Sequence, residues 1–395
     1  MFKRLCTLVL TLTLIFGLST VAVAAEQVKI KFNGKNLTTD VNPIIRQSRT
    51  LVPIGAISEA LGADVTYENA TRQITIIKGQ DTYALTVNKR EVLKNGQKLQ
   101  QLDVPPRTVN GRPMIPARFI SEVLGAKVEW DNNTFTVSIT HEEKRNGLSP
   151  VELYTKVSEA VYKQESIKYQ GKGTITAALP DVPTLSFGLG VDGAFKKPQE
   201  VWASVYLKPG IELKLAGIEP VAFEIYASGL KSYYKQNGVW TELPATPTEN
   251  LPTELLSYDP SKSAELLEKF GFILSHGNEA TIDGKTYDTL NIRLDQTKLL
   301  TFINDMLAST PAASPGLTPE QAKEAQKVFK DAMKEVKFDF SYKIFIDKDT
   351  LLINKGHLNG TVRMDIQGEN VSVKFDLIES LTYGLPVTMP DVNKK

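Results

Sequence analysis

The sequence has few of the side chains that bind soft metals or supply thiol nucleophiles. Its 395 residues include one cysteine, Cys6, and three histidines that stand far apart at positions 141, 276 and 357. A zinc site usually needs three or four such ligands drawn together. The sequence therefore predicts no metal centre, no cofactor and no cysteine chemistry.

An excess of charge of one sign is also absent. The chain has 46 Lys and Arg against 45 Asp and Glu, for a formal net charge of +1. A protein that binds nucleic acid usually presents a basic surplus to the phosphates. We therefore expect no nucleic-acid partner. The length exceeds the ~100–200 residues of an ordinary domain, so two or more domains are expected.

Long hydrophobic runs are confined to the N-terminus. Lys3 and Arg4 precede an apolar stretch at 5–18, and small residues follow at 22–25. This pattern is typical of a secretory signal peptide over 1–25, whose cleavage would remove the only cysteine and leave no membrane span. An uncleaved anchor is the alternative, because the segment is just long enough to cross a bilayer. We expect a secreted, extracellular protein that could associate with the cell wall.

A repeat occupies the first part of the remaining chain. Residues 49–65 recur as residues 112–128, at an offset of 63, and both copies contain Ser-Glu-x-Leu-Gly-Ala-x-Val. In each copy an Asn-Gly pair predicts a hairpin, and a proline starts a short helix that a glycine ends. We expect two ββαββ-like units, at about 28–77 and 90–140, that share one core.

These residues resemble the copper amine oxidase N-terminal domain family, also called the stalk domain, which is abundant in exported proteins of Gram-positive bacteria. The resemblance covers residues 28–140 and rests on the doubled Arg-x-[Leu/Met]-[Val/Ile]-Pro and Ser-Glu motifs. It implies an accessory stalk without copper or quinone. Amine oxidase activity is not expected, because the chain has no His-x-His pair and Ser257-Tyr258-Asp259 lacks the asparagine that precedes a quinone-forming tyrosine.

Four larger side chains occupy matched positions in the two copies. They are Arg49 and Arg112, and Tyr67 and Trp130. One interpretation is surface contact with a cell-wall polymer or an envelope protein, since guanidinium groups bind anions and aromatic rings stack on sugars. The alternative is that the arginines fix loops by hydrogen bonds and the rings pack in the core, because repeated residues often reflect shared packing.

The second predicted module spans residues 147–395. Ser149 and Glu152 form a capping box around a proline, which predicts a helix. Alternating apolar residues further along the chain predict antiparallel strands. We expect an α+β fold in which helices pack on a curved antiparallel half-barrel sheet. Further helices are expected at about 261–270, 297–308 and 319–335.

The same alternation gives the sheet one apolar face, which could enclose a cavity between the sheet and the helices. The side chains expected to line it are Val201, Ala203, Val205, Leu207, Phe223, Ile225, Val371, Val373 and Phe375 from three strands, and Phe329 from the last helix.

The second module also resembles the exported lipoprotein carriers of the LolA and LppX-like superfamily. The matching pieces are an opening helix followed by 166–171, the Tyr233-Tyr234 hairpin, a strand end at 345–349 and the terminal segment 383–390. The resemblance implies a sheet that curves around helices and leaves a cavity for acyl chains. The chain lacks the lipidated cysteine of the lipoprotein members.

Three functions remain open from the sequence. The first is a non-enzymatic envelope protein whose stalk presents a half-barrel to an apolar small molecule or a lipid-like ligand. The second is a structural factor that contacts protein or cell wall and has a filled core. The third is a hydrolase, but the chain has no Gly-x-Ser-x-Gly nucleophile motif. The paired acids Asp347 and Asp349 could bind calcium, but they lack the other ligands and the spacing of an EF-hand, which favours a polar turn. We therefore expect no enzymatic activity.

Overall fold

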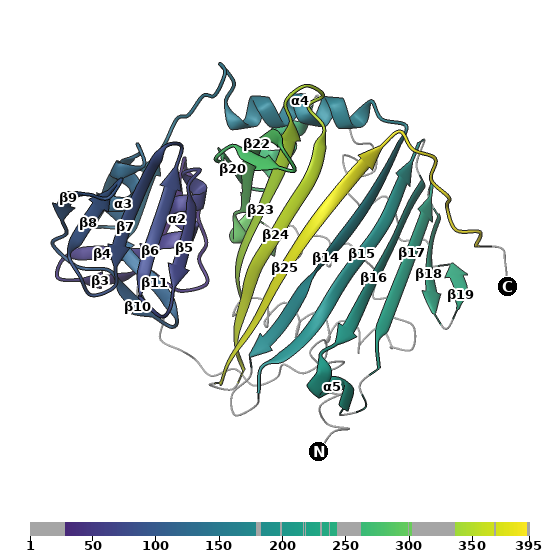
Figure 1. Ribbon diagram of the computed structural model, residues 1–395, viewed down its shortest axis with the longest axis horizontal. Helices are drawn as coiled ribbons and strands as arrows, with labels where there is room; N and C mark the ends of the chain where they lie inside the picture. The colour runs from purple at the N-terminus through teal and green to yellow at the C-terminus, as the bar shows by residue number, and fades with distance from the viewer. Residues whose placement is uncertain are drawn as a thin grey trace.

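The computed structural model describes residues 28–392, apart from 179–182, 198–199, 216, 218, 230, 237, 243–261, 299, 302–335 and 367–368 (Figure 1). Strands make up most of the described structure, and helices are few. The expected signal peptide, the helix expected at 319–335 and its Phe329 lie outside the described residues. So does most of the helix expected at 297–308. No helix in the described part of the chain has the length and apolar character to cross a membrane.

The first module consists of short strands and two short helices. The strands are β1 (Lys29–Phe32), β2 (Lys35–Asn36), β3 (Ile44–Arg46), β4 (Arg49–Pro53), β5 (Asp64–Glu68), β6 (Gln73–Lys78), β7 (Asp81–Thr86), β8 (Glu91–Lys94), β9 (Gln97–Gln101), β10 (Arg107–Val109), β11 (Arg112–Pro116), β12 (Lys127–Asp131) and β13 (Thr136–Thr140). The helices are α2 (Ile54–Ala60) and α3 (Ala117–Val123). Three sheets result, in the orders β12-β13-β1-β2, β10-β11-β4-β3 and β5-β6-β7-β8-β9.

The expected ββαββ order is not confirmed. Each repeat has four strands before its helix and two after it, namely β1–β4 with β5 and β6, and β8–β11 with β12 and β13, and β7 lies between the repeats. The additional hairpins are β3-β4 and β10-β11, which turn through residues at positive φ: Gln47 and Ser48 in the first, Asn110 and Gly111 in the second. The sheets interleave the two halves, because β1 pairs with β13 and β4 pairs with β11.

One hydrophobic core serves both repeats, as expected. It includes Ile57 and Ile74 from the first repeat and Ile120 and Val137 from the second. The same cluster contains Ile273 from the second module. The two modules are therefore in apolar contact with each other.

The second module is a long antiparallel sheet with few described helices. Its elements are α4 (Pro150–Tyr162), β14 (Ser166–Ala178), β15 (Leu185–Lys196), β16 (Glu200–Pro209), α5 (Ile211–Leu215), β17 (Val221–Ser228), β18 (Lys231–Gln236), β19 (Val239–Glu242), α7 (Ser263–Lys269), β20 (Phe272–His276), β21 (Ala280–Ile282), β22 (Lys285–Leu294), β23 (Lys337–Asp347), β24 (Ile353–Ile366) and β25 (Glu369–Tyr383). The sheet has 12 strands in the order β19-β18-β17-β16-β15-β14-β25-β24-β23-β22-β20, with β21 paired to β22.

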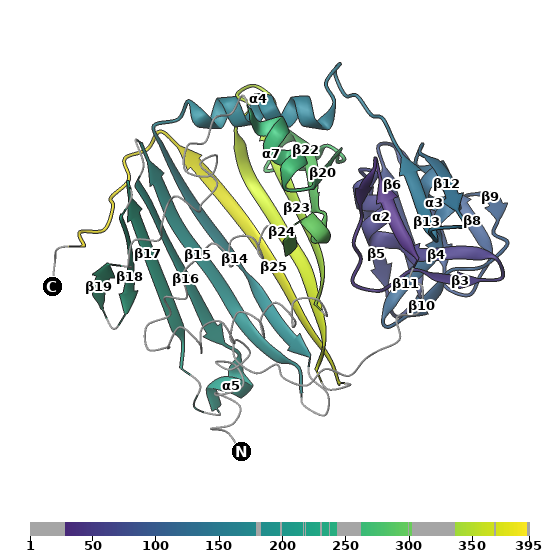
Figure 2. The ribbon, with the colours of Figure 1, turned by 180° about the vertical axis from the view of Figure 1, so that it is seen from behind.

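The sheet is curled like a half-barrel, and the first module lies beside the β20–β24 end (Figures 1 and 2). The predicted capping box is present at α4: Ser149 accepts from the backbone N–H of Glu152, and the Glu152 side chain accepts from Ser149. The helix crosses the ends of the strands (Figure 2). It starts where the sequence predicted, because both helix-capping partners are local.

Candidate functional site

One face of the 12-stranded sheet is lined by apolar side chains along most of its width. Directly opposed residues on paired strands point to the same face, and alternate residues of one strand share a face. Val205 is opposed to Phe223 on β17 and to Val191 on β15. Because β15 pairs with β14 and β14 pairs with β25, the same face continues across these strands to β25. We call this side the apolar face. It carries all nine expected lining residues that the structure describes: Val201, Ala203, Val205, Leu207, Phe223, Ile225, Val371, Val373 and Phe375.

The apolar face is covered at its β22–β23 end. Leu153 and Val157 of α4 are buried against Leu290 and Ile344, which lie on that face. Helix α7 lies in front of the neighbouring strands (Figure 2). This end of the face is therefore a packed core and offers little surface for a ligand.

Aromatic rings cover glycines towards the middle of the face. An added Cβ at Gly193 would lie 2.0 Å from the Tyr169 ring, and one at Gly356 would lie 2.6 Å from the Tyr342 hydroxyl. A ring that lies over a strand glycine fills the space its missing side chain leaves. Space at these positions is already taken by the protein's own side chains.

The β16–β17 end of the apolar face is exposed. The exposed fractions are 60% for Val221, 50% for Phe223, 41% for Ile225 and 40% for Val201. By contrast, Val371 on β25 is only 5% exposed. The nine expected residues thus share a face but not an environment, and only those on β16 and β17 include strongly exposed apolar side chains.

A hydrogen-bonded pair of polar side chains interrupts the apolar face near its centre. The Tyr342 hydroxyl donates to Glu379 over 3.1 Å. Burial raises the pKa of the Glu379 carboxyl, and the hydrogen bond from Tyr342 offsets only part of that rise. Burial, with the nearby Glu379, also raises the pKa of Tyr342. The pair is therefore a polar contact between β23 and β25 on an otherwise apolar face.

The opposite face of the sheet is polar and binds the first module. Arg293 on β22 is 4% exposed, and its guanidinium donates to Glu59 of α2 over 2.5 Å and also to Asp339 of β23. Burial raises the pKa of Asp339 even though Arg293 lowers it. Lys343 on the same face forms an ion pair with Asp64. The first module thus leaves the apolar face free.

Asp40 provides a second charged contact at this junction. Its side chain is fully buried and accepts from Arg112 over 2.7 Å and from Arg363 of β24 over 2.9 Å. Burial raises the pKa of Asp40, but the two arginines lower it more, so the pKa stays below its ordinary value. The carboxylate therefore joins one arginine from each module.

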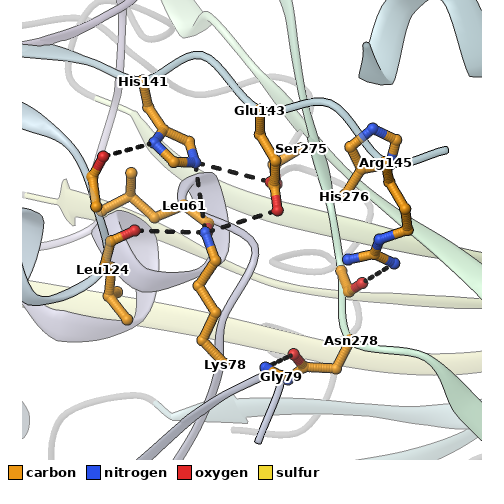
Figure 3. A network of polar contacts seen from close by, with 12 residues as sticks. Leu61, Lys78, Gly79, Leu124, His141, Glu143, Arg145, Ser275, His276 and Asn278 are labelled. Carbon is orange, nitrogen blue, oxygen red and sulfur yellow. Dashed lines mark hydrogen bonds and ion pairs between the residues drawn. The ribbon is translucent and has the colours of Figure 1, made fainter. Parts of the chain in front are cut away.

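A third contact surrounds the connector between the modules, residues 141–146 (Figure 3). Lys78 donates to the carbonyl oxygen of Leu61 over 2.6 Å, lies 3.3 Å from the His141 ring and 3.9 Å from Glu143. Burial lowers the pKa of Lys78. Arg145 donates to the carbonyl oxygen of Gly277 over 2.7 Å. The connector is thereby attached to both modules.

The four expected stalk residues have different surroundings. Arg49 pairs with Asp103 over 2.6 Å at the surface, and Arg112 is in the Asp40 contact. Tyr67 and Trp130 are partly buried against the core of the first module. Arg49 thus bonds to an acidic residue of its own module, whereas Arg112 bonds to Asp40 and, over 2.8 Å, to Thr361 of the second module. Tyr67 also lines a cleft of about 440 Å³ at the junction.

Of the residues that join the modules, sequence reasoning singled out Arg112 but not its partners. Glu59 was visible only as part of the repeated Ser-Glu motif, and Arg293 only as a charge inside an apolar strand pattern. Asp40 had no signal, because its partners are 72 and 323 residues away. Among the residues that the structure describes, no three His, Cys, Asp or Glu side chains are grouped to hold a metal ion.

Two family models match the chain. Residues 31–139 match the Copper amine oxidase N-terminal domain. This confirms the resemblance predicted for the first module. Residues 203–382 match a model described as Family of unknown function (DUF6612). A curated relative, "Protease inhibitor" from Brevibacillus choshinensis, is 24% identical over 231 residues, which cover 58% of this chain and 67% of the relative.

The solved structures that are similar to this chain include two mycobacterial proteins and a LolA superfamily protein. LprF from Mycobacterium bovis is 14% identical, with 62% of this chain and 96% of that chain covered and a TM-score of 0.27. Lipoprotein LppX from Mycobacterium tuberculosis is 11% identical, with 60% and 96% covered and a TM-score of 0.28. A LolA superfamily protein from Nitrosomonas europaea is 10% identical, with 58% and 93% covered and a TM-score of 0.19. TM-scores below 0.5 do not establish a common fold, so the architecture rests on the strand pairing above.

Proposed function

We propose that this chain is a non-enzymatic, exported protein of the cell envelope whose apolar face binds an apolar or lipid-like ligand. In this proposal residues 28–140 are a stalk and residues 147–395 the ligand-binding module. The observation that carries it is the exposure of Val201, Val221, Phe223 and Ile225 together on one face of β16 and β17.

Exposed apolar side chains that adjoin one another are unfavourable in water. Removing apolar surface from water contributes about 25 cal/mol per Å². Contiguous patches of this kind are typical of binding surfaces in soluble proteins. An acyl chain laid along β16 and β17 would bury these side chains.

Adjacent residues on β17 provide a matched test. Phe223 is on the apolar face and Ala222 on the opposite face, and both are exposed. We expect Phe223→Asp to weaken binding of a fluorescent acyl probe at least tenfold, because the carboxylate enters the proposed contact surface, and Ala222→Asp to leave it unchanged. Fluorescence titration measures both, and native mass spectrometry of protein from its own host should detect co-purified lipid.

Two outcomes would contradict the proposal. One is protein that contains no lipid and does not bind the acyl probe. The other is equal loss of probe binding in the two variants, since that would place the probe elsewhere. Circular dichroism of both variants checks that the sheet is intact.

A second candidate is inhibition of a protease, which the name of the relative from Brevibacillus choshinensis favours. It predicts stoichiometric inhibition when the full chain is titrated into secreted serine proteases and metalloproteases. Cleavage of the chain as an ordinary substrate, without inhibition, would exclude this candidate for the enzymes tested.

A further inference from the structure

The first module contains a cleft that neither proposed function uses. It has a volume of about 460 Å³ and lies among β3, β10 and the turns that follow β5 and β7. Its polar lining includes Arg46, Arg72 and Arg107, together with Asn69 and Asn88. We call it the arginine cleft. Tyr67 stands between this cleft and the one at the module junction, since it lines both.

The charge of the arginine cleft is unbalanced. Three guanidinium groups line it and no Asp or Glu does. Arg46, Arg72 and Arg107 are exposed, and none has an ion pair or side-chain hydrogen bond in the part of the chain that the structure describes. Guanidinium groups remain charged at any physiological pH, and like charges around one cavity repel.

Most of the other arginines that the structure describes bond to a carboxylate or a backbone carbonyl, and the exposed Arg90 is the exception. Arg49 pairs with Asp103, Arg112 with Asp40 and Arg293 with Glu59. Three unpaired arginines around a single cavity therefore differ from the usual arrangement in this molecule. An anion bound among them would supply the missing partner.

Shared packing of the repeats does not account for these arginines. At the offset of 63, Arg46, Arg72 and Arg107 correspond to Val109, Phe135 and Ile44. The Phe135 comparison is informative, because Arg72 and Phe135 both have positive φ and so occupy the same kind of turn. Phe135 contacts the Trp130 ring edge-on, with centroids 6.1 Å apart. In the first repeat a charged side chain takes that place beside Tyr67.

The donor set indicates the class of ligand. Each guanidinium offers a planar fork of N–H donors that fits phosphate oxygens, and several forks suit a phosphate better than a single carboxylate. The two asparagine amides and the Tyr67 hydroxyl can bond to hydroxyl groups. The volume is within the ~300–1,000 Å³ of small-molecule sites.

We propose that the arginine cleft binds a phosphate ester of a polyol or sugar. Such a group could belong to a phosphodiester-linked wall polymer or to a free small molecule. The site is separate from the apolar face, so its test is independent of acyl-probe binding.

Calorimetric titration of the full chain with two probes tests the proposal and separates the two sources. The probes are a poly(glycerol phosphate) oligomer and glycerol 1-phosphate, with neutral dextran as a control ligand. We expect binding of a phosphate ester that weakens as salt rises, because salt screens exposed charges. Binding of the oligomer alone assigns the site to a wall polymer, and binding of both probes assigns it to a single phosphate ester.

Single arginine variants test whether the phosphate ester binds in the arginine cleft. Arg72→Ala and Arg107→Ala should each weaken binding at least tenfold. Arg118→Ala is the matched control, because Arg118 is an exposed arginine of the same module outside the cleft, 3.9 Å from Glu122. All three side chains are exposed, so thermal melts of the variants should coincide. The proposal is overturned if neither phosphate ester binds, or if Arg118→Ala weakens binding as much as the cleft variants do.

Discussion

At the scale of single residues, two equivalent glycines have acquired different roles. Gly62 and Gly125 follow α2 and α3 and have φ of 78° and 88°, as expected for residues that end helices. A Cβ added at Gly62 would lie 2.0 Å from the carbonyl oxygen of His276, in the second module. A Cβ at Gly125 would be no closer than 3.8 Å to any neighbour, the His141 ring.

Substitutions at these two glycines therefore distinguish the cost of backbone strain from the cost of disturbing the contact between the modules. Gly62→Ala and Gly125→Ala should share a cost of about 1 kcal/mol for positive φ. Gly62→Ala should lose about 2 kcal/mol more in the free energy of unfolding, since a backbone carbonyl cannot easily move aside. Urea denaturation measures both, and equal losses would show that the close approach to His276 is unimportant.

The positive φ of both glycines could be predicted from the sequence, because a helix stop depends on neighbouring residues. The contact of Gly62 with His276 could not, since it joins residues more than 200 positions apart. The same distinction applies to Arg49 and Arg112: their repetition was visible, but their partners Asp103 and Asp40 were not.

At the scale of elements, the start of α4 is determined by neighbouring residues, and its position is determined by packing on the sheet. The capping box fixes its start, and Leu153 and Val157 pack it on β22 and β23. Alternation in the sequence predicted which residues share the apolar face. It could not predict that α4 covers one end of that face and that β16 and β17 are exposed, because this depends on how 12 strands are ordered.

Two substitutions test these separate contributions. Ser149→Ala should lower the free energy of unfolding by about 1 kcal/mol through loss of the cap. Leu153→Ala should lower it by about 3 kcal/mol and increase binding of a hydrophobic dye, because it weakens the cover over β22 and β23. Lys156→Ala, on the exposed side of α4, should change it by less than ~0.5 kcal/mol. Equal effects of Leu153→Ala and Lys156→Ala would contradict the packing of α4 on the sheet.

At the scale of the whole molecule, the two modules are joined through the polar face of the sheet. Asp40 contributes one of the charged contacts there, in which a fully buried carboxylate is shared between Arg112 and Arg363. Its pKa is below that of an unfolded chain, so its contribution is complete above the unfolded value near ~4 and is lost as the pH falls through the folded value.

Asp40→Asn should therefore loosen the junction. We expect the free energy of unfolding to fall by about 3 kcal/mol. This is the lower end of the range for a broken buried ion pair, because both arginines are partly exposed. Calorimetry should show two separated melting transitions where the parent chain shows one. Asp103→Asn, which breaks an exposed pair inside the first module, should cost at most ~0.5 kcal/mol. A single unchanged transition in Asp40→Asn would argue that the modules are not coupled through this carboxylate.

The duplication of the first module raises a question of orientation that one pair of residues answers. Because the two halves have matched helices, the module could in principle attach to the sheet by either one. Gly55 on α2 lies in the junction cleft, whereas its counterpart on α3 is Arg118, 66% exposed at the surface. A Cβ added at Gly55 would have only the Glu59 carboxylate, at 3.8 Å, as a near neighbour, so this position opens into the cleft and does not touch the sheet. The two repeats are therefore not interchangeable: the module presents α2 to the sheet, and α3 carries an exposed arginine at the matching position.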